Sequence, residues 1–432
     1  MKLRTFVFAF FAGGICVAAM RGQALSSLDR ERTEDMLNLV VKDVKKHYYD
    51  PNLRGVDLDA RSQEAKKRIE SAQSLGQAFT AIGWTIEGLN DSHTHFIPPR
   101  HTLQTAYGFR MQPYGDACYV TSVRPGSDAE AKGLKPGDQV LSVNGFRILR
   151  DEYSKFEYVF YTLQPQPRLR LEVRSPEGKE RNLEILSKQH EEKQQYSVQD
   201  IWQFIREGED AHEQGRTQYY EAGDGILLVK LKSFVVSDNV VDEILGKVHG
   251  KKAVLFDLRG NGGGSVDVLA RLLGVFFDHE VLIGKRVGRD QKKPQVTKTS
   301  KPTFTGQAVV LVDSHSASAS ELFARVLQLE KRGTVVGDRS AGLVMEARIY
   351  ENHLGMETEV FFATEITDAD IQMADGKSLE GRGVEPDEKV FPTGEDLATG
   401  RDPVLSRGAA LLGLNIPPDK AGTIFPFKWP KD

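Results

Sequence analysis

The chain has 432 residues, of which 40% are hydrophobic and 27% are charged. This composition is ordinary for a soluble globular protein, and the length allows two or three domains with sizeable cores. The formal net charge is −4, so there is no general electrostatic reason for the protein to bind nucleic acid.

Residues 1–24 have the pattern of a secretory signal peptide. Lys2 and Arg4 precede an apolar run from Thr5 to Met20, and a small-x-small sequence follows that ends at Ala24. We expect cleavage near Ala24 and a periplasmic or secreted mature protein. An uncleaved membrane anchor is the second interpretation, because the apolar run is short for a full span.

Residues 25–100 are predicted to form an N-terminal helical cap. Apolar side chains recur every three or four positions from Leu37 to Tyr48, which indicates an amphipathic helix, and Pro51 predicts its end. Two further helices are expected at 62–71 and 75–86.

Residues 101–188 change to short strands and turns. A short helix ended by Gly133, a Pro-Gly turn at 136–137 and a strand closed by Asn144–Gly145 follow one another. This run is similar to a PDZ domain, and such domains bind extended peptides by strand addition and hold a chain-terminal carboxylate on backbone N–H groups. The alternative is a small β-rich lid without affinity for peptides. By the resemblance, the carboxylate loop comprises Tyr107, Gly108, Phe109 and Arg110.

Residues 189–224 are polar and rich in glutamine and glutamate, which is typical of a linker or a surface insertion. From 225 to 432, strands alternate with helices. This rhythm predicts an α/β core in which a mostly parallel sheet is flanked by helices.

Two strand-to-helix corners in this core present backbone N–H groups. An apolar run over 308–312 predicts a buried strand, and helical spacing resumes at Glu321 after a turn of small residues. A second buried run over 252–259 is closed by the glycine-rich segment 260–264, where glycine permits close approach of the backbone to a ligand. Helix capping would explain either corner alone. Two such corners favour an acyl-transfer site whose N–H groups stabilise an oxyanion.

The residues of these corners resemble those of the carboxyl-terminal processing, or tail-specific, serine protease family. The resemblance is carried by Ser-Ala-Ser-Ala-Ser-Glu at 316–321, Gly337–Asp338 and Asp-Leu-Arg-Gly-Asn-Gly-Gly-Gly at 257–264. It extends from about Leu37 to Leu412 and implies a ClpP/crotonase-like core with Ser318 as the nucleophile. The oxyanion donors that it implies are the backbone N–H groups of Gly263 and Ala319.

The sequence departs from the usual members of that family at the catalytic base. Those members activate the serine with a lysine in a Gly-Lys-Gly segment, and Leu343 stands at that place here. Because a leucine cannot accept a proton, the site is either inactive or served by another base.

Ser92, His93 and Glu380 offer such a base. In the tricorn-like branch of the superfamily, the base is a histidine that follows a serine, and a glutamate beside the closing Gly-Arg-Gly turn completes the relay. The resemblance carries these roles to His93, Ser92 and Glu380, since a glutamate can orient and stabilise a histidinium. The structural alternative is that this Asp-Ser-His sequence is only a turn. His95, on the same side of an extended segment, is the reserve base, and His315 is expected at most to support the site.

The expected function is therefore that of an exported serine endopeptidase of the tail-specific type. By the resemblance, its PDZ-like domain captures protein or peptide substrates through free, unstructured C-termini. The alternative is a catalytically inactive homologue that acts as a peptide-binding or scaffolding protein. No metal or organic cofactor is implied and no nucleic acid partner is expected, while peripheral proximity to a membrane and the oligomeric state stay open.

Overall fold

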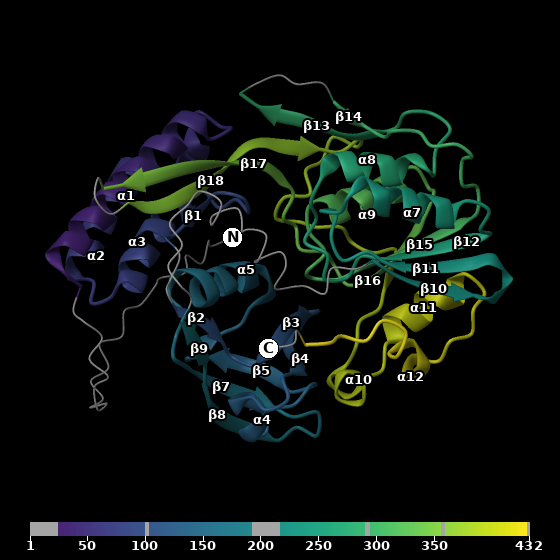
Figure 1. Ribbon diagram of the computed structural model, residues 1–432, viewed down its shortest axis with the longest axis horizontal. Coiled ribbons are helices and arrows are strands. Elements are labelled where there is room, and N and C mark those ends of the chain that lie inside the picture. The colour runs from purple at the N-terminus through teal and green to yellow at the C-terminus, as the bar shows by residue number, and fades with distance from the viewer. Residues whose placement is uncertain (1–24, 100–102, 192–216, 290–293, 356–358, 430–432) are drawn as a thin grey trace, which may run out of the picture.

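The computed structural model describes residues 25–99, 103–191, 217–289, 294–355 and 359–429. Within these ranges the chain forms an α/β core, a β-rich PDZ-like domain and a group of N-terminal helices (Figure 1), as the sequence predicts. The predicted signal peptide, residues 1–24, lies outside the described residues. No helix within the described ranges is both long enough and apolar enough to cross a membrane.

The core is built on a six-stranded sheet. In spatial order its strands are β10 (Gln218–Ala222), β11 (Ile226–Lys230), β12 (Ala253–Asp257), β15 (Gln307–Val312), β16 (Thr334–Gly337) and β19 (Glu388–Lys389). Only β10 pairs antiparallel within this sheet, with β11, so the prediction of a mostly parallel sheet is confirmed. β10 falls inside the predicted linker 189–224, so part of that segment is a strand of the core.

Helices cover both faces of this sheet, which is why its central strands are almost continuously apolar. One face packs against α7 (Asp238–Val248), α8 (Val266–Gly274) and α9 (Ala319–Leu329), and the other against α11 (Pro403–Leu411) and α12 (Pro418–Ala421).

The N-terminal helices are α1 (Ser27–His47), α2 (Leu58–Ser71) and α3 (Leu75–Glu87), close to the predicted segments. Each begins after a capping side chain that accepts a hydrogen bond from a first-turn N–H group. The capping residues are Ser26, Asp57 and Ser74.

A long hairpin, which the sequence analysis did not predict, connects these helices to the core (Figure 1). It consists of β17 (Met345–Leu354) and β18 (Val360–Gln372), and β18 pairs with β1 (His95–Ile97) and β13 (Leu282–Gly288). Phe362 and Ile366 of β18 are fully buried against the helices. The hairpin therefore fixes β1, and with it the turn that contains Ser92 and His93.

The PDZ-like domain contains a mostly antiparallel sheet in which β3 is an edge strand. Its strands are β3 (Phe109–Tyr114), β4 (Ala117–Val123), β5 (Gln139–Val143), β6 (Phe146–Arg147), β7 (Arg168–Arg174) and β8 (Glu180–Leu186). An edge strand keeps backbone groups available for pairing with another chain.

The remaining elements are η1 (Leu53–Gly55), β2 (Leu103–Ala106), α4 (Asp128–Ala131), η2 (Arg150–Glu152), α5 (Tyr153–Glu157), η3 (Tyr158–Leu163), β9 (Lys188–Glu191), η4 (Gly223–Gly225), β14 (Gln295–Val296) and α10 (Gly394–Thr399).

Candidate active site

The two strand-to-helix corners lie side by side at the carboxyl ends of the core strands, because β12 and β15 are adjacent and parallel. The Ala317 N–H donates to the Asn261 carbonyl oxygen at 3.0 Å. The hydroxyl of Ser316 donates to Leu258 O, and that of Ser320 donates to Asn261 O, each at 2.9 Å. The serines on either side of Ser318 thus hold the corners together.

Ser318 has a different environment from its neighbours. It is partly exposed, whereas the other residues of 316–321 are buried. Its backbone has φ 52° and ψ −116°, a conformation that costs a non-glycine residue about 1–3 kcal/mol and persists only where surrounding contacts impose it. Its N–H lies 3.0 Å from Leu343 O and 3.0 Å from Glu321 Oε2, and these contacts hold the strained residue at the start of α9.

Glu321 organises this corner through four hydrogen bonds to its buried carboxylate. Oε1 accepts from Ser340 Oγ at 2.5 Å and from Gly342 N at 2.8 Å. Oε2 accepts from Ser318 N and Leu343 N, both at 3.0 Å. Burial raises the pKa of Glu321 to about 7, against the opposing effect of the four donors. Sequence reasoning missed this residue, although its position three residues after Ser318 is the spacing of a capping box.

The two predicted oxyanion donors are placed differently. Ala319 is the first residue of α9, where an N–H group has no partner within the helix. Gly263 has φ 104°, and a Cβ atom there would lie 2.7 Å from Ser318 Cβ, so only glycine allows this approach. However, its N–H donates to Asn261 Oδ1 at 2.9 Å. The structure therefore gives that N–H a side-chain acceptor, as in an Asx turn, which the glycine pattern did not predict.

The turn that carries His93 is attached to the β17–β18 hairpin. Thr367 Oγ1 of β18 donates to Asp91 Oδ1 at 2.9 Å, and His93 N donates to the same oxygen at 3.0 Å. Ser92 N donates to Glu380 Oε1, and Ser92 Oγ donates to Glu380 Oε2, each at 2.8 Å. Ser92 is thereby held to the carboxylate by both its backbone and its side chain.

This arrangement selects one tautomer of His93. His93 Nδ1 lies 2.6 Å from Ser92 Oγ. Because the single hydroxyl proton of Ser92 goes to Glu380, Nδ1 must carry a proton, which leaves a lone pair on Nε2. Burial lowers the pKa of His93 to about 4, so the imidazole is neutral at pH 7. Burial also disfavours the charged form of Glu380 and so raises its pKa, although its hydrogen bonds from Val344 and Ser92 oppose the shift.

A two-residue segment, Leu343–Val344, connects the Ser318 corner to the His93 turn. Leu343 O accepts from Ser318 N at 3.0 Å, and Val344 N donates to Glu380 Oε2 at 2.9 Å. Glu380 in turn binds Ser92. These hydrogen bonds, with the peptide bond between Leu343 and Val344, connect the backbone N–H of Ser318 to Glu380 and, through Ser92, to His93. Leu343 takes part through its backbone.

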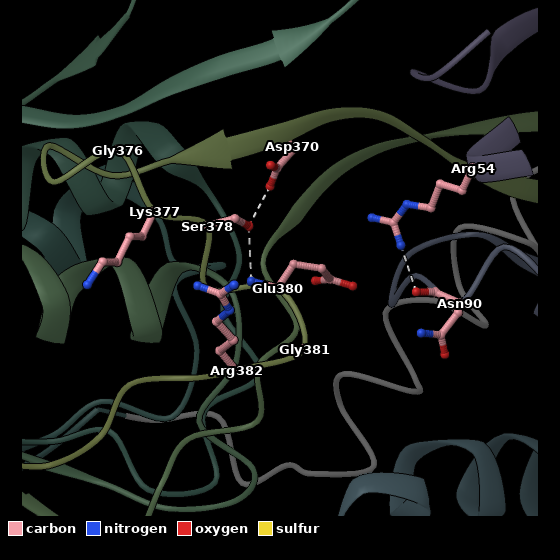
Figure 2. Close-up of a pocket in the computed structure, with 9 residues that line it drawn as sticks. All are labelled: Arg54, Asn90, Asp370, Gly376, Lys377, Ser378, Glu380, Gly381 and Arg382. Carbon is pink, nitrogen blue, oxygen red and sulfur yellow. Dashed lines mark hydrogen bonds between the residues drawn. The ribbon is translucent and has the colours of Figure 1, made fainter. Parts of the chain in front are cut away.

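The backbone of Glu380 is fixed from the opposite side (Figure 2). Its N–H donates to Ser378 Oγ at 3.1 Å, and Ser378 Oγ donates to Asp370 Oδ1 at 2.6 Å. These residues border a cavity of about 390 Å³, which Arg382 also lines. In Figure 2 the carboxylate extends away from Ser378, toward the side of Asn90, the residue that precedes the Asp91–His93 turn.

The other histidines make different contacts. His95 Nε2 lies 2.8 Å from Ser92 O, so this reserve candidate for the base donates a hydrogen bond to the turn. Its Nε2 is therefore not available as an acceptor. The ring of His315 lies 5.5 Å from that of Tyr153 in the PDZ-like domain.

The predicted carboxylate loop is divided between core and surface. Tyr107 and Phe109 are buried in the hydrophobic core of the PDZ-like domain. Gly108 has φ 73°, and the turn that it forms precedes β3. Arg110 is partly exposed.

Edge strand β3 is attached to the corner before Ser318. Gln112 Nε2 donates to Asp313 Oδ2, and Ser314 Oγ donates to Pro113 O, both at 2.7 Å. Asp313 Oδ1 also accepts from Gly260 N at 2.9 Å. One buried carboxylate thus connects the PDZ-like domain to both corners of the site.

Comparisons with known sequences agree with this division of the chain. Residues 225–390 match the family model described as Peptidase family S41, and residues 98–151 match the one described as PDZ domain. The chain is 24% identical over 324 residues to the tail-specific protease of Haemophilus influenzae, covering 69% of this chain and 43% of that protein. It is 24% identical over 367 residues to the chloroplastic carboxyl-terminal-processing peptidase 1 of Arabidopsis thaliana, covering 80% and 71%.

Comparison with solved structures shows the same fold. Mature CPAF complexed with lactacystin superposes with a TM-score of 0.65 at 16% identity, covering 86% of this chain and 96% of that one. The photosystem II D1 C-terminal processing protease gives a TM-score of 0.51 at 17% identity, covering 90% and 99%.

Proposed function

We propose that this chain, which carries a Peptidase family S41 domain next to a PDZ domain, is a serine endopeptidase of the tail-specific type. Ser318 is the nucleophile, His93 the general base, and Ser92 and Glu380 hold and polarise the imidazole. The observation that carries this proposal is the position of the Glu380 carboxylate. It binds Ser92, which contacts His93 Nδ1, and it also binds the N–H of Val344, next to the carbonyl oxygen that accepts from the Ser318 backbone N–H.

In the proposed reaction, Ser318 Oγ attacks the carbonyl carbon of the scissile peptide while its proton passes to His93 Nε2. The negative charge that develops on the carbonyl oxygen is stabilised by the Ala319 N–H at the start of α9. The imidazolium then gives the proton to the leaving amine, and an acyl-enzyme forms on Ser318. Water, activated by the same imidazole, hydrolyses the ester and restores the serine.

Two features of the site support this chemistry. The partly buried carboxylate of Glu380, acting through the Ser92 hydroxyl, favours the Nδ1–H tautomer and stabilises the imidazolium. The Gly263 N–H can join Ala319 as a second donor if the substrate oxygen replaces its present acceptor, Asn261 Oδ1. Removing one such donor typically lowers kcat by about 10²–10³-fold.

The substrates that we propose are proteins with free, unstructured C-termini, which the PDZ-like domain would capture. The attachment of β3 to Asp313 supports a route from that domain to the corner of Ser318. We further propose export directed by residues 1–24, and the division of the mature chain into a cap (25–100), a PDZ-like domain (101–188), a connecting segment that begins at 189, and a protease core that begins with β10 rather than at 225.

A fluorophosphonate probe tests the proposed activity directly. The mature chain is expected to form a covalent adduct, and mass spectrometry should locate it on Ser318 because that serine is partly exposed and strained. The same preparation should cleave a reporter protein that ends in an unstructured tail, and should leave uncut a reporter whose tail is blocked at its carboxylate.

The second candidate function is peptide binding without catalysis, which Leu343 favours because no lysine base stands at that position. Absence of the adduct across pH 5–9, together with retained binding of tail peptides, would support this function and contradict the first.

A further inference from the structure

The C-terminal tail of the chain extends from the α/β core onto the PDZ-like domain. Ile424 and Phe425 pack against the core cluster on the α11–α12 face of the sheet. Beyond them, the Phe427 ring lies 4.8 Å from the guanidinium carbon of Arg110, and the Trp429 ring lies 5.9 Å from that of Arg124. Figure 1 shows this end of the chain beside β3 and β4.

Arg110 belongs to the loop that the sequence analysis assigned to carboxylate binding, and Arg124 lies beside that loop. Arg110 is the second residue of β3 and pairs with Ser122 of β4. Arg124 follows β4, and its N–H donates to Gly108 O at 2.8 Å. Because Arg124 is two residues beyond Ser122, its side chain shares a face of the ribbon with that of Arg110.

The charge of Arg110 also acts on the helical segment of the domain. Burial raises the pKa of both Glu157 in α5 and Tyr161 in η3, and the positive charge of Arg110 opposes both shifts. Arg110 therefore lies within electrostatic range of this helical segment as well as of the tail.

The spacing of the tail matches this pair of cations. In an extended peptide, side chains two residues apart point to the same side, and Phe427 and Trp429 are separated by one lysine. Their rings contact each other edge to face, with centroids 5.3 Å apart. Arginine over an aromatic face is a favourable contact, and it retains selectivity because an aliphatic side chain of similar size lacks the ring quadrupole.

We propose that Arg110 and Arg124 form a recognition site for chain ends that carry two aromatic side chains two residues apart, and that the protein's own tail occupies this site until such an end displaces it. The proposal rests on the proposed function only for the cleavage of the bound chain, because binding itself needs no catalysis. It names the substrate class as unstructured C-termini with an aromatic-x-aromatic sequence.

The tail must compete strongly because it is tethered. Linked segments have effective concentrations in the millimolar range when the linker spans the sites. A tail that docks with equilibrium constant K reduces the apparent affinity for an external peptide by a factor of 1 + K. Emptying the site should therefore strengthen peptide binding, and the ratio of the two Kd values equals 1 + K.

The experiment measures fluorescence anisotropy of a labelled peptide that spans residues 425–432 with a free carboxylate. The full-length mature chain is used with Ser318→Ala, so that the peptide stays intact whether or not the protein is a protease. Adding Phe427→Ala and Trp429→Ala to the chain is expected to lower the Kd at least about tenfold, because the competing tail loses both ring contacts.

Three matched controls define the site. In the emptied chain, Arg110→Ala with Arg124→Ala should weaken binding by about tenfold or more, since two cation–π contacts are lost. Arg170→Ala, which removes an exposed arginine from β7 of the same domain, should leave the Kd unchanged. A peptide with leucine in place of Phe427 and Trp429 should bind about tenfold more weakly than the aromatic peptide.

Equal Kd values for the wild-type and emptied tails would show that the tail does not occupy the site. An unchanged Kd in the double arginine variant, or equal binding of the leucine peptide, would overturn the assigned recognition chemistry. Proteolysis is measured in a separate assay, and its absence would not affect the binding results. Failure of this inference is therefore distinguishable from failure of the proposed function.

Discussion

Replacing His93 with alanine is expected to lower kcat for a tailed reporter by roughly 10²–10⁴-fold, the usual contribution of a positioned general base. The reason is that, in the proposed mechanism, Nε2 of His93 accepts the Ser318 proton, and the Leu343 side chain provides no substitute. KM should change little, because the imidazole is not part of the surface proposed to bind the substrate tail. Steady-state kinetics on the purified mature chain measure both constants.

His95→Ala is the matched control, since it removes a histidine two residues away whose Nε2 is already directed to Ser92 O. We expect a much smaller loss of kcat for this variant. Ser318→Ala defines the background rate. If His93→Ala retained wild-type kcat, or if His95→Ala were the more damaging change, the relay through Ser92 and Glu380 would be refuted.

Replacing Glu321 with glutamine should damage both stability and activity. All four contacts to this buried carboxylate come from donors, namely the Ser340 hydroxyl and three backbone N–H groups. A glutamine amide directs an NH₂ group at two of those donors. In either orientation one backbone N–H, that of Gly342 or that of Leu343, loses its acceptor, whereas Ser318 N keeps Leu343 O and the Ser340 hydroxyl can accept from the amide. A buried unsatisfied group costs about 1–3 kcal/mol, so we expect a loss of that size in the free energy of unfolding.

The same substitution should lower kcat because the strained Ser318 and the Gly342–Leu343 segment lose the group that fixes them. A loss of about 10–100-fold follows if this positioning contributes roughly 1.4–2.8 kcal/mol to the transition state. Urea unfolding and steady-state kinetics test the two effects. Glu70→Gln, which changes an exposed side chain on α2, provides a control that should change neither quantity.

Glu321 also predicts opposite pH trends for activity and stability. Its pKa is raised from 4.5 to about 7. The stability that protonation provides to the folded state is therefore fully present below pH 4.5 and is lost as the pH rises through about 7. Activity should rise over the same range, because only the carboxylate accepts all four donors, while His93, with a pKa of about 4, is already neutral.

Measurements of kcat/KM and of unfolding free energy between pH 5 and pH 8 test these trends. In Glu321→Gln both slopes near pH 7 should disappear. A persistent rise of kcat/KM near pH 7 in that variant would assign the titration to another group and contradict this account.

The parts of the fold that depend on local periodicity were predictable from the sequence. The helices of the cap, the buried strand before Ser318 and the mostly parallel sheet all follow from the spacing of apolar residues. The β17–β18 hairpin was missed because its partners, β1 and the N-terminal helices, are more than 250 residues away in the sequence. Nothing local to residues 345–372 specifies that pairing.

The site was predictable to the extent that resemblance named its residues. The structure brings Ser92, His93 and Glu380 into one hydrogen-bonded chain, while their catalytic roles stay predictions. The spacing of Glu321 from Ser318 indicates its capping contact with Ser318 N, which the sequence analysis overlooked. Its bonds from Gly342 and Leu343, and the bond from Gly263 to Asn261, were not predictable, because they depend on where backbone N–H groups point after the two corners meet. Residue type alone carries no information on those directions.

The way in which position 343 is used has a consequence for substitutions there. The surrounding hydrogen bonds use only the backbone N–H and the carbonyl oxygen of this residue, and every L-amino acid except proline offers both. The side chain at this position can therefore change from aliphatic to amine while these two backbone contacts stay in place. Combining Leu343→Lys with His93→Ala would show whether an amine at this position can replace the proposed histidine base.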